Sequence, residues 1–213
     1  MDILKLFLPK KTASFSSEVN GNISIAELHG KKIVYAGGAE QTGGTITGMW
    51  KKAFNKIGKL PHPKGNCLVL GLGGGDVIRL LQKRYPEMKI DCVELDPVMI
   101  EIAGKFFNLK ANGKLKIYRA DAYDWFSKSG RKYDLIIVDL FIGFLNPERF
   151  RQIKFLKKMK EHLAGGGLVL YNSHYRKKNA GEFQKFLDLC RCIFTDMDTI
   201  IEYRFSRIII MVK

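Results

Sequence analysis

The sequence predicts an α/β protein: a doubly wound, mostly parallel sheet of seven strands, preceded by a short N-terminal β-hairpin. Short apolar runs alternate with amphipathic helical runs across residues 61–172, as in repeated βαβ units. Two more apolar runs, 199–203 and 208–212, are separated by a short turn and predict a closing antiparallel pair. We therefore expect two parts, residues 1–60 and residues 61–213.

The N-terminal part predicts a tail, a hairpin and one helix. Residues 1–18 are polar to mixed in character, which favours poor order. Residues 22–28 and 32–35 alternate between apolar and polar on either side of a turn, which is the pattern of a β-hairpin. The glycine-rich residues 37–45 predict a mobile loop. A helix is predicted at 46–57, with Met49, Trp50, Ala53 and Phe54 toward the core.

An apolar strand, a glycine-rich turn and an amphipathic helix follow one another from residue 67 onward. The turn contains Gly71, Gly73, Gly74 and Gly75. Glycines let the backbone turn sharply and approach a ligand with no Cβ in the way, and the following helix presents free N–H groups. Glu94 ends the next strand, about twenty residues on, where a carboxylate can accept hydrogen bonds from both ribose hydroxyls of a nucleoside. The unit therefore predicts a nucleoside-cofactor site.

Two further strands of the predicted sheet also end in carboxylates. Asp121 and Asp139 each follow an apolar run of strand length. Together with Glu94 they place three carboxylates along one carboxyl edge of a parallel sheet, which is where open α/β sheets bind ligands. The spacing of the glycines in the turn is shorter than the G-x-G-x-x-G fingerprint of nicotinamide enzymes. A dinucleotide is therefore the weaker prediction.

The C-terminal half supplies the remaining elements. Asn146-Pro147-Glu148 predicts the start of a helix, and three glycines at 165–167 predict its end. Residues 168–172 predict a fifth strand and residues 182–194 a last helix. The buried stripe expected on the first of these helices consists of Phe150, Ile153, Leu156, Met159 and Leu163.

Five motifs occur in order along the chain: Gly73-Gly74-Gly75-Asp76, Val93-Glu94-Leu95-Asp96-Pro97, Phe106-Phe107, Asp121-Ala122 and Tyr133-Asp134-Leu135-Ile136-Ile137-Val138-Asp139. Their order resembles that of S-adenosylmethionine-dependent transferases. Their amino-acid sequences resemble those of the spermidine synthase family over about residues 20–172. The resemblance implies a Rossmann-like domain of class I methyltransferase type at residues 61–213. It also implies that this domain binds S-adenosylmethionine or decarboxylated S-adenosylmethionine.

Roles for individual side chains follow from the same resemblance. Glu94 would hold the ribose, Asp121 the adenine amino group, and Asp76 the amine of the cofactor's tail. Gln41 matches a conspicuous glutamine of the family's N-terminal β-domain. The other residues expected at the cofactor site are Gly71, Gly73, Gly74, Gly75, Ala122 and Asp139. A homodimer is a further expectation at the level of the family.

The expected acceptor pocket departs from the family. Members carry Asp-Ser-Ser-Asp or a similar run after the fourth strand, and its last carboxylate takes a proton from the diamine. Here the run is Asp139-Leu140-Phe141-Ile142, so that an isoleucine stands at this position and Asp139 becomes the candidate catalytic residue. The family's Tyr-His-Glu stretch is also missing. The loop after this strand is apolar at Leu140, Phe141, Ile142, Phe144 and Leu145. This character favours either a greasy or aromatic acceptor or a buried plug, and the two interpretations weigh equally.

Three functions remain open at this point. Methyl transfer from S-adenosylmethionine to an unknown small-molecule acceptor is favoured by the lack of a carboxylate at Ile142. Polyamine aminopropyl transfer, as in spermidine synthase, is favoured by Asp76, whose charge would repel the carboxylate of intact S-adenosylmethionine. The third hypothesis is a non-catalytic cofactor-binding protein with a basic interaction surface.

The composition of the chain limits which classes of partner and which cellular location are expected. A net charge of +15 would attract an anionic partner such as nucleic acid or acidic lipid. No aromatic-interleaved RNA motif accompanies the charge, so a solvated basic surface is preferred over nucleic-acid binding. No apolar run reaches the ~18 residues of a membrane span, and the first residues lack the pattern of a secretion signal, which together predict a cytoplasmic protein. The four cysteines lack zinc spacing, so no metal site is expected.

Overall fold

Two sheets make up the computed structural model, which describes residues 8–203 and 205–213, and only the backbone of residues 198–200. The smaller, N-terminal sheet is antiparallel, with the strand order β1-β2-β3-β4. The predicted hairpin is its β2–β3 pair, and β4 lies within the stretch predicted as a mobile loop. The strands are β1 Lys10–Ser17, β2 Gly21–Leu28, β3 Lys31–Ala36 and β4 Ala39–Thr42.

Strand β1 corrects the expectation of poor order for residues 1–18, of which the first seven lie outside the described part. Phe15 packs edge-on against Phe106, with 5.7 Å between the ring centroids. Ser17 Oγ donates a hydrogen bond of 2.6 Å to Asp96 Oδ2. These long-range contacts hold β1 against helix α3 (Pro97–Phe107). The composition of residues 1–18 cannot reveal them, because they join segments that are far apart in the sequence.

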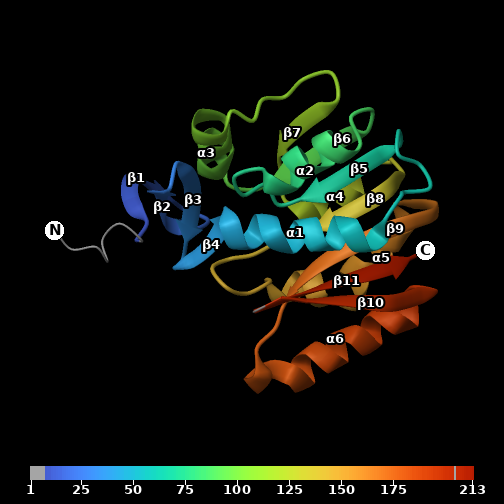
Figure 1. Cartoon of the computed structure of the whole chain (residues 1–213). Helices are drawn as coiled ribbons and strands as arrows, with labels where there is room; N and C mark the ends of the chain where they lie inside the picture. Colours follow the sequence, from blue (N-terminus) through green and yellow to red (C-terminus); the bar gives the residue numbers. More distant parts are fainter. Residues whose placement is uncertain (1–7, 204) are drawn as a thin grey trace.

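The larger sheet has seven strands in the order β10-β11-β9-β8-β5-β6-β7 (Figure 1). Neighbours among β5 to β9 pair in parallel, and β11 pairs antiparallel with both β9 and β10, which confirms the predicted mostly parallel sheet. The strand order reverses between β5 and β8, and sheets of this kind bind ligands at such a point. The strands are β5 Asn66–Leu70, β6 Lys89–Glu94, β7 Leu115–Arg119, β8 Tyr133–Val138, β9 Leu163–His174, β10 Asp196–Tyr203 and β11 Ser206–Val212.

Helices cover both faces of the larger sheet, which confirms the double winding. Leu135 and Ile137 of β8 pack in one buried cluster with α1 and α2, whereas the alternate residues Ile136 and Val138 pack in another with α4, α5 and α6. Figure 1 shows α1 running across the larger sheet from the smaller one. The helices are α1 Gly44–Ile57, α2 Asp76–Arg84, α3 Pro97–Phe107, α4 Ala122–Lys128, α5 Ile153–Glu161 and α6 Ala180–Ile193, with short 3-10 turns η2 Glu148–Arg151 and η3 Lys177–Asn179.

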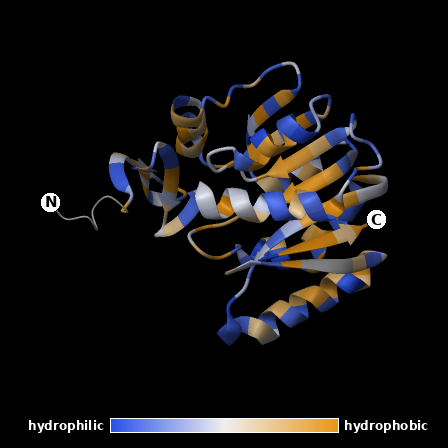
Figure 2. Ribbon diagram, in the orientation of Figure 1, coloured by the Kyte–Doolittle hydropathy of each residue, from blue (hydrophilic) through white to orange (hydrophobic). Residues whose placement is uncertain are grey.

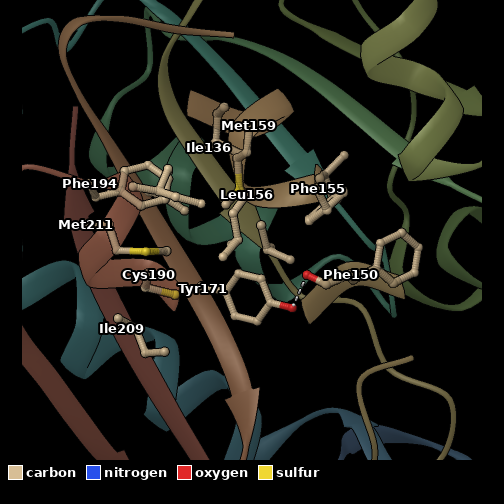
Figure 3. Packing of buried hydrophobic residues seen from close by; sticks show 14 of the residues in the cluster. Ile136, Phe150, Phe155, Leu156, Met159, Tyr171, Cys190, Phe194, Ile209 and Met211 are labelled. Atoms are coloured by element: carbon tan, nitrogen blue, oxygen red, sulfur yellow. Dashed lines mark hydrogen bonds between the residues drawn. The ribbon is translucent and has the colours of Figure 1, made fainter. Parts of the chain in front are cut away.

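Hydropathy follows this arrangement. Strands of the larger sheet are mostly hydrophobic in Figure 2, as expected for strands that helices cover on both faces. Figure 3 shows the cluster beneath α5 and α6, where the Tyr171 hydroxyl donates to the carbonyl oxygen of Phe150 at 3.0 Å. Without this bond, the buried hydroxyl group of Tyr171 would have no hydrogen-bond partner in the core. No helix in the described residues has both the length and the apolar character needed to cross a membrane.

The chain after β8 differs from the prediction in two places. The turn η2 precedes α5, so Ile153 lies at the start of the helix and is 41% exposed rather than part of a buried stripe. Leu163 already belongs to β9, and the three glycines that follow lie inside this strand. A Cβ at Gly167 would lie 3.1 Å from the carbonyl oxygen of Tyr133. Close packing against β8 therefore explains a glycine that the sequence suggested as a helix end.

Candidate active site

The glycine turn between β5 and α2 uses most of its own backbone N–H groups. The hydrogen bonds run from Gly71 N to Val93 O (2.9 Å), Leu72 N to Glu94 Oε2 (2.8 Å), Gly74 N to Thr42 Oγ1 (2.5 Å) and Gly75 N to Leu72 O (2.9 Å). A turn that cradles a diphosphate needs such donors for the phosphate oxygens. The turn therefore suits a nucleoside without phosphates better than a dinucleotide, in agreement with the spacing of its glycines.

Two of the glycines are required because other strands approach them closely. A Cβ at Gly71 would lie 2.1 Å from the carbonyl oxygen of Asp139, and one at Gly73 would lie 2.9 Å from that of Gln41. Both glycines also have positive φ angles, 93° and 51°. The turn is thus the junction at which the smaller sheet and the tip of β8 meet. The other two glycines face side chains, Gly74 against Thr42 and Gly75 against Leu109.

The carboxylate of Glu94 lies at the tip of β6 beside this turn. Its Oε2 accepts the bond from Leu72 N, and its Oε1 accepts one from Asp96 N, both at 2.8 Å. Desolvation raises the pKa of Glu94, and the two backbone hydrogen bonds act against this rise. Each oxygen keeps a further lone pair. Glu94 can therefore hold the turn and still accept hydrogen bonds from two ribose hydroxyls.

Asp121 has partners on both of its oxygens. Its Oδ1 accepts from Tyr123 N at 2.8 Å and caps the start of α4, while its Oδ2 pairs with the guanidinium of Arg149. That guanidinium also lies 4.6 Å from the ring centroid of Phe150. Arg149 therefore covers the place that the resemblance assigns to adenine, and nothing in the sequence singles it out.

One cavity at the carboxyl edge of the larger sheet brings these groups together. Of the residues expected at the cofactor site, it is lined by Gln41, Gly71, Gly73, Glu94, Asp121, Ala122 and Asp139. The remaining walls include the apolar residues Leu95, Met99 and Phe150. Carboxylates at two strand tips beside apolar walls fit the hydroxyls of a ribose and the flat face of a base. The residues present thus fit an S-adenosyl compound.

Asp76 is not among the residues that line this cavity. Its Oδ2 accepts from Gly43 N and from Thr47 Oγ1, each at 2.9 Å, and its Oδ1 forms an ion pair of 2.5 Å with Arg79. Asp76 therefore joins the start of α1 to the start of α2. Arg79 pairs with this carboxylate, but the charge of Asp76 still contributes to the raised pKa of Asp139 in the cavity wall.

Asp139 directly follows β8, and its carboxylate is held from two sides. Trp50 Nε1 of α1 donates to Oδ2 at 3.0 Å, and Asn172 Nδ2 of β9 donates to Oδ1 at 2.8 Å. Desolvation raises the pKa of Asp139 to about 6, although both hydrogen bonds lower it. The carboxylate is therefore ionised at neutral pH yet close enough to protonation to act as a proton acceptor. Asn172 Oδ1 is buried with no hydrogen-bond partner among the described residues.

A second cavity adjoins the first at Asp139. It holds about 190 Å³, and the two cavities share Gln41, Gly73, Asp139 and Phe141 as lining residues. Its other walls come from α1, the loop after β8 and the β10–β11 hairpin, and include Ile46, Met49, Phe144, Tyr203 and Phe205. Glu40 supplies a second carboxylate to this lining. An acceptor in this cavity would present its nucleophile beside Asp139 and toward the first cavity.

Three of the five apolar side chains in the loop after β8 are exposed, so the interpretation of the loop as a buried plug is wrong, whereas Leu140 and Phe141 are half-buried. Ile142 and Leu145 pair through their backbones in a tight turn around Gly143, whose φ is 58°. Their side chains are 53% and 51% exposed, and that of Phe144 is 42% exposed. The loop folds across both cavities, where Gln41 Nε2 donates to the carbonyl oxygen of Gly143 at 3.3 Å. The exposed side chains of Ile142, Phe144 and Leu145 therefore form part of the surface beside the two cavities.

Two partners of Asp139 were not expected at the site. Trp50 was predicted only as a core residue, and Asn172 only as the end of a strand; their approach to Asp139 depends on the packing of α1 and β9 against β8. The position of Asn172 at a strand tip was the one available signal. Within the described residues, no group of three or more histidine, cysteine, aspartate or glutamate side chains is placed to hold a metal ion.

The curated relatives of this chain include aminopropyltransferases and methyltransferases. It is 34% identical over 125 residues to a polyamine aminopropyltransferase of Vibrio vulnificus, which covers 57% of this chain and 42% of that protein. It is 31% identical over 124 residues to an eEF1A lysine and N-terminal methyltransferase homolog of Drosophila melanogaster, covering 52% of this chain and 18% of that protein. The chain thus spans less than half the length of either relative.

A solved structure has a similar fold. Human methyltransferase-like protein 13, in complex with SAH, superposes with a TM-score of 0.64 at 25% identity, over 78% of this chain and 79% of that one. The family model of the spermine/spermidine synthase domain matches residues 49–203, which include α1 from Met49 onward, the glycine turn, all three strand-tip carboxylates and both partners of Asp139. This chain therefore belongs to the spermine/spermidine synthase domain family.

Proposed function

We propose that this chain is a transferase that moves a carbon group from an S-adenosyl compound to an amine nitrogen. The observation that carries the proposal is the position of Asp139, on the shared wall of the two cavities with its carboxylate fixed by Trp50 and Asn172. The names of the two relatives support an amine acceptor, because one concerns polyamines and the other lysine and N-termini.

The geometry and the charges of the site support the following roles for its residues. A bound S-adenosyl compound supplies a sulfonium-activated carbon and a neutral thioether leaving group. Asp139 takes the proton from the acceptor's ammonium group, since only the neutral amine has a lone pair for attack. The N–C bond forms as the C–S bond breaks, the C–S electron pair passes to sulfur, and the positive charge moves to nitrogen. Glu94 and Asp121 hold the nucleoside so that donor and acceptor meet in line.

Methyl transfer from S-adenosylmethionine is the favoured reaction. Asp76, whose charge was the reason to prefer the decarboxylated form, is paired with Arg79 and does not line the cofactor cavity. The family's carboxylate for a diamine is replaced by Ile142, which is exposed at the rim. The acceptor walls are largely aromatic and aliphatic, which suits an amine on an apolar stem.

Aminopropyl transfer is the second candidate, and Glu40 favours it. This residue lines the acceptor cavity, and its Oε1 accepts from Thr45 N at 3.0 Å at the start of α1. A carboxylate apart from Asp139 could pair with the second ammonium of a diamine. A non-catalytic cofactor-binding role is the third candidate and requires that neither donor be consumed.

The test is product analysis with both donors at pH 8. The protein is incubated with S-adenosylmethionine or its decarboxylated form and with an amine: a lysine peptide, a peptide with a free N-terminus, or a polyamine. We expect S-adenosylhomocysteine to form with at least one amine, and Asp139→Asn to slow its formation about 10²–10⁴-fold. Undiminished turnover in Asp139→Asn would overturn the assigned role, and binding without consumption of either donor would support the non-catalytic alternative.

A further inference from the structure

Three segments far apart in the chain build a basic and aromatic groove beside the acceptor cavity. They are the loop after β8, the segment between β9 and α6 that contains η3, and the β10–β11 hairpin. The groove is lined by Phe144, Tyr175, Arg176, Lys177, Lys178, Phe205 and Arg207. Four of these residues are cationic, three are aromatic, and none is acidic. We call this set the basic-aromatic groove.

Aromatic rings and guanidinium groups alternate within the groove. The guanidinium carbon of Arg176 lies 5.3 Å from the ring centroid of Phe144 and 6.0 Å from that of Phe205. That of Arg207 lies 4.0 Å from the ring centroid of Tyr175. The two phenylalanines are nevertheless 42% and 59% exposed. Both phenylalanine rings therefore keep part of their surface open to solvent although a guanidinium group lies beside each of them.

We propose that the basic-aromatic groove binds a single-stranded nucleic acid. A single strand offers phosphates and flat bases in alternation, and proteins bind it by combining cationic side chains with aromatic stacking platforms. Lys177 and Lys178 are exposed and suited to phosphates, while Phe144 and Phe205 present faces on which bases can stack. An acidic peptide would use the cations alone and leave both exposed rings without a function.

The sequence alone favoured a solvated basic surface over nucleic-acid binding, because no motif combines aromatic and basic residues along the chain. The fold changes this conclusion. Aromatic and basic residues are not interleaved along the chain, but folding interleaves them in space. Phe144 and Phe205 line the acceptor cavity as well as the groove. A bound strand would therefore lie across the mouth of that cavity. The inference stands independently of the transfer reaction, because it concerns binding only.

The test measures fluorescence anisotropy with a labelled oligouridine of about 12 nucleotides. We expect the double variant Phe144→Ala/Phe205→Ala to bind about tenfold more weakly than the unaltered protein. The unaltered protein should also bind an abasic strand of the same length about tenfold more weakly, a comparison that needs no variant to fold. Equal affinity for the abasic and the uridine strands would overturn the proposal, since it would exclude stacking.

A matched pair of variants separates the groove from the overall charge. Lys177→Ala/Lys178→Ala and Lys154→Ala/Lys157→Ala each remove two exposed lysines, the first pair from the groove and the second from α5. The groove variant should reduce the slope of log K against log salt by about 1.4, and the α5 variant should leave it unchanged. Equal reductions would show diffuse attraction and overturn the proposal. Polyglutamate that competes at equal charge concentration would overturn it in favour of an acidic protein partner.

Discussion

The indole N–H of Trp50 donates a hydrogen bond of 3.0 Å to Oδ2 of Asp139. This bond joins α1 to the tip of β8, and Asn172 holds the other carboxylate oxygen from β9. Three elements therefore fix one carboxylate between the two cavities. Preorganisation of this kind lets a carboxylate accept a proton without first rearranging its surroundings. The first two predictions follow from the raised pKa of this group.

The first prediction concerns the pH dependence of transfer. Asp139 must be ionised to accept a proton, and its pKa is raised to about 6. The rate with a saturating amine should therefore rise with pH and level off above a midpoint near 6, provided that Asp139 is the acceptor. Steady-state kinetics between pH 5 and 8 measure this directly. A profile without that limb, or the same limb in Asp139→Asn, would assign the proton to another group.

The second prediction concerns stability. Because the pKa of Asp139 rises from 3.8 to about 6 on folding, its ionised form opposes folding above pH 6, and the cost vanishes below the unfolded value. Asp139→Asn should therefore raise the free energy of unfolding by about 2 kcal/mol at pH 8. The gain should shrink as the pH falls to 4.5. Urea unfolding at both pH values tests the sign, and a gain that grows toward low pH would disprove it.

The third prediction assigns the ribose to Glu94. Glu94→Gln should weaken S-adenosylhomocysteine binding by about 1.5–3 kcal/mol, the scale of hydrogen bonds to a charged group. Isothermal titration calorimetry measures the change. Glu161→Gln, at the exposed end of α5, is the matched control and should leave the affinity unchanged. If Glu94→Gln binds as tightly as this control, Glu94 does not contact the ribose.

The fourth prediction concerns the glycine turn. Gly71→Ala would place a Cβ 2.1 Å from the carbonyl oxygen of Asp139, so the turn or the tip of β8 must shift. We expect a loss of more than about 2 kcal/mol of stability together with weaker cofactor binding. Gly113→Ala is the control, because a Cβ there meets nothing within 4 Å and its φ lies outside the strained positive range. Equal melting temperatures for the two variants would contradict this account.

The features that could be predicted from the sequence are those that depend on short-range patterns of apolar and polar residues. Glu94, Asp121 and Asp139 each end an apolar run, and parallel pairing brings the ends of such runs to one edge. The structure accordingly brings all three to one cavity. The seven-stranded sheet and its two helical faces followed from the same alternation. The ligand roles assigned to these carboxylates remain predictions.

Long-range packing decided the rest. Asp76 has the residue type and position of a family motif, but Thr47 and Gly43 approach it from the N-terminal part and Arg79 from its own helix. Of these three partners, only Arg79 is a neighbour in sequence, one turn along α2. Phe144 and Phe205 face one groove only because the β8 loop and the β10–β11 hairpin fold together. No local sequence pattern predicts that these two side chains line the same groove.

The most direct test of the proposed acceptor preference uses putrescine with decarboxylated S-adenosylmethionine, followed by chromatography for spermidine and methylthioadenosine. Ile142 stands where the family places a carboxylate for the diamine, so putrescine loses a charged partner there even though Asp139 can take its proton. Because removing one partner of a buried charge pair costs about 2–5 kcal/mol, we predict turnover at least about 10²-fold below ordinary enzyme rates. The same preparation should form S-adenosylhomocysteine from S-adenosylmethionine with a better amine. Spermidine formation at about 1 s⁻¹ or faster would contradict the account and make aminopropyl transfer, with Glu40 and Asp139 as its carboxylates, the function of this chain.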